Sequence, residues 1–494
     1  MPVKNQEKNF QHRPPVVAVV GHVDHGKTTL LDYIRKTNVA TKEVGGITQS
    51  TGAYEIEHSS TSSGQAHKIT FIDTPGHEAF SLMRARGAAA ADLAILVVAA
   101  DEGIKPQTTE AIGILKSTET PFIVAITKID KPNANIDKVK NELQSAEVLL
   151  EGYGGDVSWH GVSGVSGEGV NELLDLIVLT GEVAGLTFDP EAKARGFVIE
   201  SRKENRRGII AHLVLKDGVL KAGENIATPS ASGKIKILED FLGHRAKELW
   251  PSAPALVVGF EKLPRAGEEF TVGKTNTPQV KITPAPKTAA PKRGKPLNFR
   301  VILKADTTGS LEAMEALLKN LVEIGEASVG EISDSDVNFA KSTKSVIVGF
   351  NVLPGKSAAR LADAQRVKII TSSIIYKVAD AVSEMLKAEE EEKIKGSLEV
   401  MAVFSIARAR KTIGGKVSEG VLRVGNNVEI ERNTAAPDGG EPRPEAGREV
   451  VGKGKITNLQ RDKEDAREVP QGNECGLVVE TPVNIEVGDT LKVV

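Results

Sequence analysis

The chain has 494 residues with 63 basic and 66 acidic side chains, and its formal net charge at pH 7 is −3. This balance argues against a protein that holds naked nucleic acid mainly by its phosphates, because such proteins are more basic. The sequence contains no run of the ~18 apolar residues that a membrane-spanning helix needs, and residues 1–15 lack the apolar core of a secretory signal. The single cysteine, Cys475, excludes an intrachain disulfide. We therefore expect a cytoplasmic protein of three or four domains without a membrane partner.

The first motif is a glycine-rich loop that fully matches G-x-x-x-x-G-K-[ST]. It lies between the apolar run Val16–Val20, a predicted strand, and a helical pattern that begins at Leu30. Backbone N–H groups of such a loop point at an anion, and the helix N-terminus adds partial positive charge. A chance match in a glycine-rich turn is disfavoured by these flanking elements. We predict that Lys27 reaches the outer phosphates of a nucleotide, that the Thr28 hydroxyl ligates Mg²⁺, and that the loop residues are Gly21, His22, Val23, Asp24, His25, Gly26, Lys27, Thr28 and Thr29.

Two later segments predict contacts near a γ-phosphate. Thr48 lies in a polar loop, and its hydroxyl would complete the coordination of Mg²⁺ when the γ-phosphate is present. The predicted strand Lys68–Ile72 leads into D-T-P-G-H, where Asp73 would hold Mg²⁺ through a water and Gly76 lets the backbone approach the phosphate. His77 follows, and its imidazole would orient the attacking water or stabilise transition-state charge. Without the phosphate loop upstream, Thr48 and His77 would be interpreted as ordinary surface residues.

Strands and helices alternate through this region, which predicts a doubly wound, mostly parallel sheet. The predicted strand Phe122–Ile126 runs into Thr127-Lys128-Ile129-Asp130. At this place the Asp130 carboxylate would accept both N–H donors of the guanine edge, and the Lys128 stem would lie over the base. GTP is therefore predicted rather than ATP, and a surface Lys/Asp pair is the alternative.

GHVDHGKTT, GGIT, DTPGHEAF and TKID, in this order, resemble the motifs of translational GTPases. They are most similar to those of the bacterial translation initiation factor two family, with its archaeal and eukaryotic relatives next. The resemblance implies GTP and GDP as nucleotides, Mg²⁺ as the metal, and ribosome-stimulated hydrolysis of GTP to GDP and phosphate. Two positions depart from the family: Thr127 stands where Asn is usual, and the serine-alanine-lysine loop appears as Ser163, Gly164 and Val165. We expect these changes to act on nucleotide affinity rather than on base choice.

The patterning along the chain predicts a multidomain α/β and all-β protein. Its expected parts are a polar N-terminal segment (1–13), a P-loop GTP-binding domain (14–186), a β-barrel (194–274), a linker rich in Pro, Ala and Lys (275–296), an α/β sandwich domain (297–386), a helical connector (387–397) and a C-terminal β-barrel (398–494). RGFVIESR and DGVLKAGE resemble the family's second domain. KAD, SDSDV, GFNV and SSIIY (residues 372–376) resemble its third domain, which acts as a spacer. From the residues alone, that domain offers a core and a scaffold.

Near the C-terminus, residues 472–476 read GNECG, close to the G-x-E-C-G stretch that lines the family's pocket for the formylmethionine end of initiator tRNA. The resemblance implies an apolar lining near Cys475. In the family's other pocket segment a cysteine commonly follows a glycine pair, but here Lys416 follows, and it would extend outward or pair with Glu474. The residues implied in initiator tRNA binding are Gly472, Glu474, Cys475 and Gly476.

The resemblance implies a translation initiation factor that uses GTP to position formylmethionyl initiator tRNA on the small ribosomal subunit and promotes subunit joining. Its expected partners are the small and then the large subunit, the initiator tRNA and other initiation factors. The long N-terminal extension of many bacterial members has no counterpart here, so its contacts to the small subunit are not expected. The alternatives are an elongation-type GTPase that carries another aminoacyl-tRNA, and a nucleotide-binding scaffold without significant hydrolysis. Asp130 opposes a third reading, a P-loop ATPase or kinase.

Overall fold

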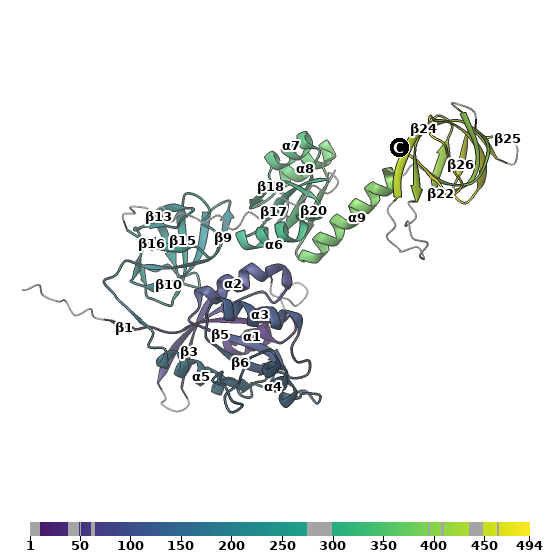
Figure 1. Cartoon of the computed structure of the whole chain (residues 1–494). Coiled ribbons are helices and arrows are strands. Elements are labelled where there is room, and N and C mark those ends of the chain that lie inside the picture. The colour runs from purple at the N-terminus through teal and green to yellow at the C-terminus, as the bar shows by residue number, and fades with distance from the viewer. Residues whose placement is uncertain are drawn as a thin grey trace, which may run out of the picture. The chain divides into compact units, whose positions relative to one another are not determined.

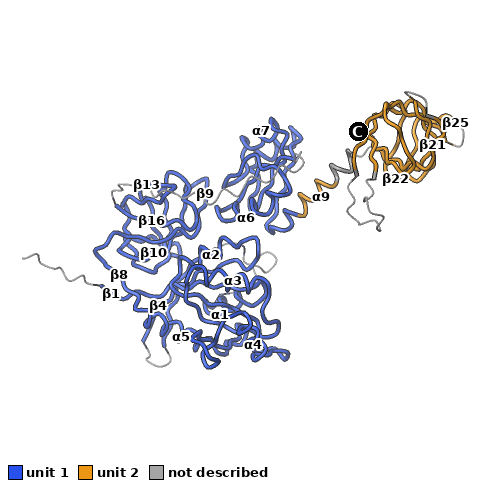
Figure 2. The backbone as a smooth tube through the Cα atoms, viewed as in Figure 1, with its two compact units in different colours: residues 1–379 blue, residues 380–494 orange. Residues whose placement is uncertain are grey.

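The structure, a computed structural model, describes residues 10–37, 49, 51–60, 65–273, 299–393, 396–406, 410–433, 448–461 and 464–494. The chain divides into two compact units, residues 1–379 and 380–494, shown in different colours in Figure 2. Among the described residues, no helix has both the length and the apolar character needed to cross a membrane. The predicted linker at 275–296 lies outside the described residues.

The first domain is a six-stranded sheet with helices on both faces (Figure 1). The strand order is β3-β4-β2-β5-β6-β7, and neighbouring strands are parallel except β3 and β4. Its strands are β2 (Val16–Gly21), β3 (Gly52–Ser59), β4 (Ala66–Asp73), β5 (Leu93–Ala99), β6 (Phe122–Thr127) and β7 (Trp159–Gly161). Its helices are α1 (Lys27–Arg35), α2 (Ser81–Ala90), α3 (Pro106–Ser117), α4 (Ile136–Ser145) and α5 (Val170–Val183), with the 3₁₀ turn η2 (Glu78–Phe80) before α2. The predicted doubly wound sheet is confirmed.

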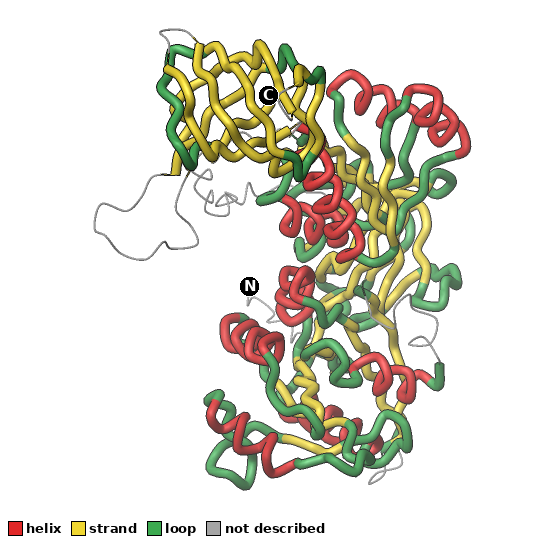
Figure 3. The backbone as a smooth tube through the Cα atoms, turned by 90° about the vertical axis from the view of Figure 1, so that its right-hand side faces the viewer, coloured by secondary structure: helices red, strands yellow, loops and turns green. Residues whose placement is uncertain are grey.

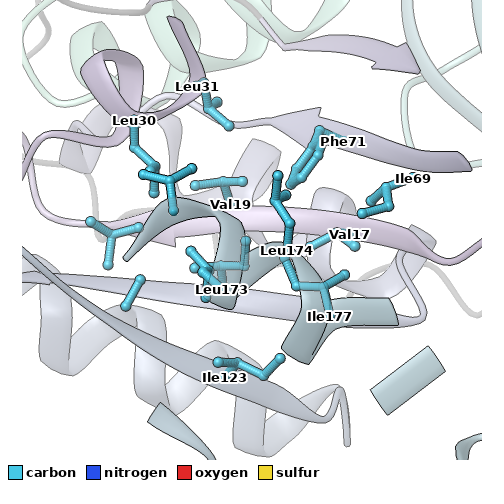
Figure 4. Packing of buried hydrophobic residues seen from close by; sticks show 14 of the residues in the cluster. Val17, Val19, Leu30, Leu31, Ile69, Phe71, Ile123, Leu173, Leu174 and Ile177 are labelled. Atoms are coloured by element: carbon cyan, nitrogen blue, oxygen red, sulfur yellow. The ribbon is translucent and has the colours of Figure 1, made fainter. Parts of the chain in front are cut away.

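Strand β2 is buried along its whole length because helices cover both faces of the sheet. Val17 and Val19 pack on one face against α1 and α5, in the cluster that Figure 4 shows. Ala18 and Val20 belong to the cluster on the other face, with residues of α2, α3 and α4. The two cores fix the carboxyl end of β2, where the glycine-rich loop begins.

The second domain is a closed barrel whose strands follow the order β10-β15-β13-β12-β16-β9. They are β9 (Arg195–Glu204), β10 (Gly208–Asp217), β12 (Asn225–Ala227), β13 (Ser232–Glu239), β15 (Pro254–Phe260) and β16 (Glu269–Val272). Outside the barrel, β11 (Leu220–Lys221) pairs with β14 (Glu248–Leu249), and β1 (Gln11–His12) pairs with β8 (Thr187–Phe188). The predicted barrel is confirmed.

The third domain is a smaller parallel sheet of order β18-β17-β19-β20. Its strands are β17 (Arg300–Ala305), β18 (Glu323–Val329), β19 (Val346–Phe350) and β20 (Ile369–Ser372). Its helices are α6 (Thr308–Leu318), α7 (Asp334–Thr343) and α8 (Lys356–Gln365), and the long helix α9 (Ile375–Lys393) follows β20. The α/β arrangement predicted here is therefore present.

The second unit contains a barrel of antiparallel strands, drawn in yellow in Figure 3. Its strands are β21 (Gly396–Ile406), β22 (Arg410–Arg423), β23 (Asn427–Asn433), β24 (Arg448–Arg461), β25 (Glu464–Asp465), β26 (Glu468–Pro470), β27 (Glu474–Glu480) and β28 (Thr490–Val493). The pairing of β21 with β22 closes the order β21-β28-β23-β24-β27-β22 into a ring around one apolar core. This barrel agrees with the predicted fold class.

Candidate functional site

The glycine-rich loop leaves β2 at Gly21 and enters α1 at Lys27, three residues before the helical pattern was expected to begin. Asp24 (φ 63°) and Gly26 (φ 85°) adopt left-handed backbone conformations, which bend the loop over the helix N-terminus. Two neighbours hold the loop: the Val23 amide donates to Gln107 Oε1 (3.1 Å), and Thr127 Oγ1 donates to the His25 carbonyl (2.5 Å). The loop is therefore supported by side chains, and its N-cap residue, Gly26, makes no side-chain cap.

A cavity of about 270 Å³ lies over this loop. It brings together four of the five segments that the sequence predicted to form a nucleotide site, although they are far apart in the chain. The lining residues are Val23, Asp24, Gly26, Lys27, Thr28, Thr29, Gly76, His77, Thr127, Lys128, Asp130, Lys131, Gly164 and Val165.

Lys27 supplies positive charge at the floor of the cavity. Its Nζ atom donates to the carbonyls of Gly21 (2.9 Å) and His22 (2.6 Å). Burial lowers the Lys27 pKa to about 8, although the nearby Asp73 carboxylate opposes this shift. A Cβ atom at Gly76 would stand 2.4 Å from Nζ, so a residue with a side chain cannot occupy that position without displacing Lys27. A buried ammonium beside a loop of backbone N–H groups fits a polyphosphate.

The predicted base-recognition residues Thr127, Lys128 and Asp130 also line the cavity. Asp130 is exposed there, and the Lys128 ammonium lies 3.1 Å from Glu102 Oε1. Ser163 Oγ accepts hydrogen bonds from the amides of Val165 (3.3 Å) and Ser166 (3.0 Å). The Ser163 side chain therefore shapes the loop, and Gly164 and Val165 line the cavity.

His77 also lines the cavity, and its neighbours hold the loop after β4 in place. Burial is the main cause that lowers the His77 pKa. Arg84 in α2, whose side chain is 0% exposed, donates to the carbonyls of Pro75 (3.1 Å) and His77 (2.5 Å). The same guanidinium makes two bonds to the Glu110 carboxylate (2.8 and 2.7 Å). These contacts fix the backbone that carries Gly76 and His77.

Five predicted residues support the cavity and do not line it. Gly21, His22 and His25 contribute the carbonyl acceptors described above, and Ser163 shapes its own turn. Burial, together with His22, lowers the pKa of His25 to about 4, so this ring is neutral at pH 7. Asp73 ends β4, with its carboxylate 3.4 Å from the Arg35 guanidinium. Thr48 lies outside the described residues.

Comparison with known proteins places the chain in a family. Residues 12–181 match the model of the elongation factor Tu GTP binding domain, residues 193–273 that of elongation factor G domain 2, and residues 276–383 that of translation-initiation factor 2. Translation initiation factor IF-2 of Onion yellows phytoplasma is 37% identical over 99% of this chain and 80% of its own length. The factor of the same name from Bacillus licheniformis is 38% identical over 99% of this chain and 69% of its own. The chain belongs to the translation initiation factor IF-2 family.

This membership makes the chain a translation initiation GTPase that binds GTP and GDP and hydrolyses GTP. Among solved structures, GDP-bound aIF5B from Aeropyrum pernix is 28% identical, over 98% of this chain and 92% of that one, with a TM-score of 0.45.

The C-terminal segment GNECG forms a turn and the start of β27, and one expectation for it is wrong. Cys475 is 6% exposed and packs in the core of the barrel, where burial raises the thiol pKa to about 11. Its side chain therefore does not line a surface pocket. Glu474 and Gly476 alternate with Cys475 and face outward. In the strand register Gly476 lies opposite Gly414, and Glu474 lies opposite Lys416.

Sequence reasoning missed the residues that support the cavity from other elements: Gln107, Arg84 and Glu110. Arg84 carries the clearest signal, since it is a charged residue in the helix SLMRARGAAA, which is otherwise mostly small and apolar. A buried arginine requires hydrogen-bond acceptors, and the loop before α2 offers backbone carbonyls that are not paired in a helix or sheet. The others carry no local signal, because their partners are far away in the chain.

Proposed function

We propose that the chain uses GTP as a switch to position formylmethionyl initiator tRNA on the small ribosomal subunit, promotes subunit joining, and hydrolyses GTP on the ribosome. The observation that supports the GTP switch is the single cavity shared by the phosphate loop, Asp130, Gly164 and His77. In this proposal the GTP-binding domain spans 14–186 and the initiator tRNA domain spans 398–494. The protein works in the cytoplasm, with other initiation factors as further partners.

Within the cavity, Lys27 and the loop amides neutralise phosphate charge, and the backbone at Gly76 approaches the γ-phosphate. The Thr28 hydroxyl and the Asp73 carboxylate offer the oxygen ligands that Mg²⁺ prefers, with Thr48 as a third. Mg²⁺, when bound, supplies further neutralisation of the phosphate oxygens. Asp130 selects guanine, while Thr127 holds the loop and Lys128 covers the base.

His77 orients the attacking water in this proposal. Exchange of His77 for Ala should leave GTP affinity near the parental value and slow ribosome-stimulated phosphate release by ~10²- to 10⁴-fold. His244→Ala is the matched control, because the His244 side chain is 74% exposed and lies in the second domain, between β13 and β14. Phosphate release at the parental rate in the His77 variant would remove His77 from the reaction.

The outer face of the C-terminal barrel, around Glu474, Gly476 and Gly414, is proposed to receive the formylmethionyl end of the tRNA. The backbone of Gly476 is accessible there, since a Cβ at this position would meet nothing within 4 Å, whereas the Phe404 ring lies over Gly414, with its Cε2 2.9 Å from where a Cβ would stand. A free α-ammonium would lose water without a clear partner, so the formylated ligand should bind more tightly. Titration of the full chain with formylmethionyl-tRNA and methionyl-tRNA tests this. Glu474→Ala should reduce the difference and Lys416→Cys should keep it, whereas equal affinities would leave the tRNA ligand of the parent unidentified.

A further inference from the structure

The turn that opens α9 contacts two loops of the GTPase domain that flank β3 and β4. Gln49, beside Thr48, donates from Nε2 to the Ser373 carbonyl (2.8 Å), and its Oε1 accepts from the Ile375 amide (3.2 Å). In the first turn of α9, the Tyr376 hydroxyl is hydrogen-bonded to Nδ1 of His77, 299 residues away in the chain. The two rings lie edge to face with their centroids 4.0 Å apart. One turn of the third domain therefore contacts the neighbour of Thr48 and also His77.

The bonds at Nδ1 determine where the imidazole carries its proton. The Ala79 amide also reaches Nδ1 (3.3 Å), and an amide N–H can act only as a donor. Nδ1 is therefore the acceptor, and the Tyr376 O–H is a second donor to it. A neutral imidazole has one N–H, so the proton lies on Nε2. Burial, which lowers the pKa of His77, keeps the ring neutral at pH 7.

We propose that Tyr376 is a positioning residue that fixes the His77 ring in its Nε2–H tautomer, so that His77 presents a hydrogen-bond donor to the nucleotide cavity. In this state Nε2 cannot take a proton from the attacking water, and His77 acts by orienting that water or by stabilising charge on the γ-phosphate. Gln49 bonds to the turn at Ser373 and Ile375, so the contact exists while Gln49 and the third domain stay together. The inference rests on the proposed role of His77 in hydrolysis.

The third domain then has a part in hydrolysis beyond that of a spacer. The side chain that aligns His77 comes from a different domain. Its role is like that of the third residue of a catalytic triad, which orients the base. A change in the position of the third domain would release the ring. Tyr376 touches His77 and is not among the residues that line the nucleotide cavity, so its removal should change the rate and spare nucleotide affinity.

The test is Tyr376→Phe in the full chain, because phenylalanine keeps the ring contact and removes the hydroxyl. Loss of one hydrogen bond to a neutral partner should slow ribosome-stimulated phosphate release by about 3- to 10-fold, at unchanged GTP affinity. Tyr153→Phe is the matched control, since the Tyr153 hydroxyl accepts a bond from Lys140 at a distance from the cavity. Parental rates in Tyr376→Phe would overturn the proposal.

Nitrogen-15 spectra of the histidine side chains give a readout that a purely structural role would not move. The His77 signals are identified by their loss in His77→Gln. The parent should show an unprotonated Nδ1 and a protonated Nε2, and both Tyr376→Phe and Gln49→Ala should shift this towards a mixture of tautomers. A protonated Nδ1 in the parent, or an unchanged spectrum in Tyr376→Phe, would overturn the proposal. If His77→Ala hydrolyses GTP normally, the role of His77 itself fails, whereas a slow His77→Ala beside a normal Tyr376→Phe refutes the role of Tyr376 alone.

Discussion

The GTPase domain and the third domain both place a helix directly after a central parallel strand, yet the two helix N-termini are used differently. In the GTPase domain five residues separate β2 from α1, and the N-cap residue Gly26 offers no side-chain cap. In the third domain two residues separate β17 from α6, and Thr307 Oγ1 accepts from the Ser310 amide (3.2 Å). The first N-terminus stays open to a ligand, and the second is closed by its own chain.

The second N-terminus also has an anion, but it comes from the protein. Glu200 of the barrel strand β9 is 4% exposed, and its Oε1 accepts from the Thr308 hydroxyl (2.8 Å) and the Gly309 amide (3.1 Å). A Cβ at Gly309 would stand 2.8 Å from Glu200 Oε2 and 2.3 Å from Met83 Cε, so glycine permits the close approach. The positive end of a helix attracts negative charge in both domains. Whether that charge is a substrate or a structural carboxylate depends on the loop, and the shared fold does not determine it.

The largest effect is expected from a change at Asp130, the predicted base-recognition residue of the nucleotide cavity. Asp130→Asn should weaken GTP binding by up to ~10⁴-fold and improve binding of xanthosine triphosphate, whose ring presents an acceptor where guanine has a donor. Nucleotide titrations of the parent and variant measure both effects. Asp137→Asn, a change of a side chain that is 84% exposed on α4, is the control. Unchanged GTP affinity in Asp130→Asn would mean that this carboxylate does not contact the base.

The closed N-terminus gives the next largest effect. Glu200→Ala removes the acceptor of two donors at the start of α6 and should cost about 1–3 kcal/mol of local stability there. Glu200→Gln keeps an oxygen acceptor for the same two donors and should therefore lose less local stability than Glu200→Ala, about 1 kcal/mol or less. Hydrogen exchange of the amides at the start of α6 measures both changes. Equal exchange in the parent and in Glu200→Ala would show that the carboxylate does not cap this helix.

The sequence predicted the open site well because its chemistry depends on local spacing. Gly21, Gly26 and Lys27 lie within seven residues, and the apolar run before them reads as a strand without tertiary information. Cys475 was misplaced although the pattern held the answer: it alternates in register with Leu477 and Val479, which face the core. Period-two alternation was a better guide to the direction of that side chain than the motif.

The contacts between domains could not be predicted in this way. Glu200 and Gly309 are 109 residues apart, and Tyr376 and His77 are 299 residues apart. A glutamate in a strand or a tyrosine in a helix looks locally like a surface or core residue, because nothing in its neighbourhood indicates the partner. Contacts of this kind can be identified only in the folded structure, where residues of different domains lie next to each other.

The two helix N-termini also differ in charge. Lys27 places an ammonium group at the start of α1, whereas the capping contacts of α6 described above include no ammonium group. Burial lowers the Lys27 pKa to about 8 in the nucleotide-free protein, and bound phosphates would favour the charged form and raise it. Above pH 8 binding must therefore take up a proton, so GTP affinity should fall by about 5- to 10-fold between pH 7.5 and 9. Titrations across this range measure the fall. Lys27→Arg, which stays charged, should lose this dependence, and a flat profile in the parent would contradict the lowered pKa.

The smallest expected effect concerns Thr127, where this chain departs from its family. The Thr127 side chain is buried, and its hydroxyl donates to the His25 carbonyl, so it holds the glycine-rich loop from the end of strand β6. A Cβ at Gly26 would meet Thr127 Oγ1 at 3.7 Å, so the hydroxyl also stands against the loop at ordinary contact distance. Threonine thus keeps the contact to the loop with a shorter side chain.

Thr127→Asn should retain the bond to the loop and add a second polar group at the cavity wall. We expect GTP to bind about 2- to 5-fold more tightly, because one further hydrogen bond contributes little once water is displaced. Thr127→Val has nearly the same shape without the hydroxyl, so it should weaken binding by leaving the His25 carbonyl without this donor. If both variants bound GTP as tightly as the parent does, the support from β6 would have no part in keeping the N-terminus of α1 ready for phosphate. The open N-terminus of α1 and the closed N-terminus of α6 would then differ only in the loops that precede them.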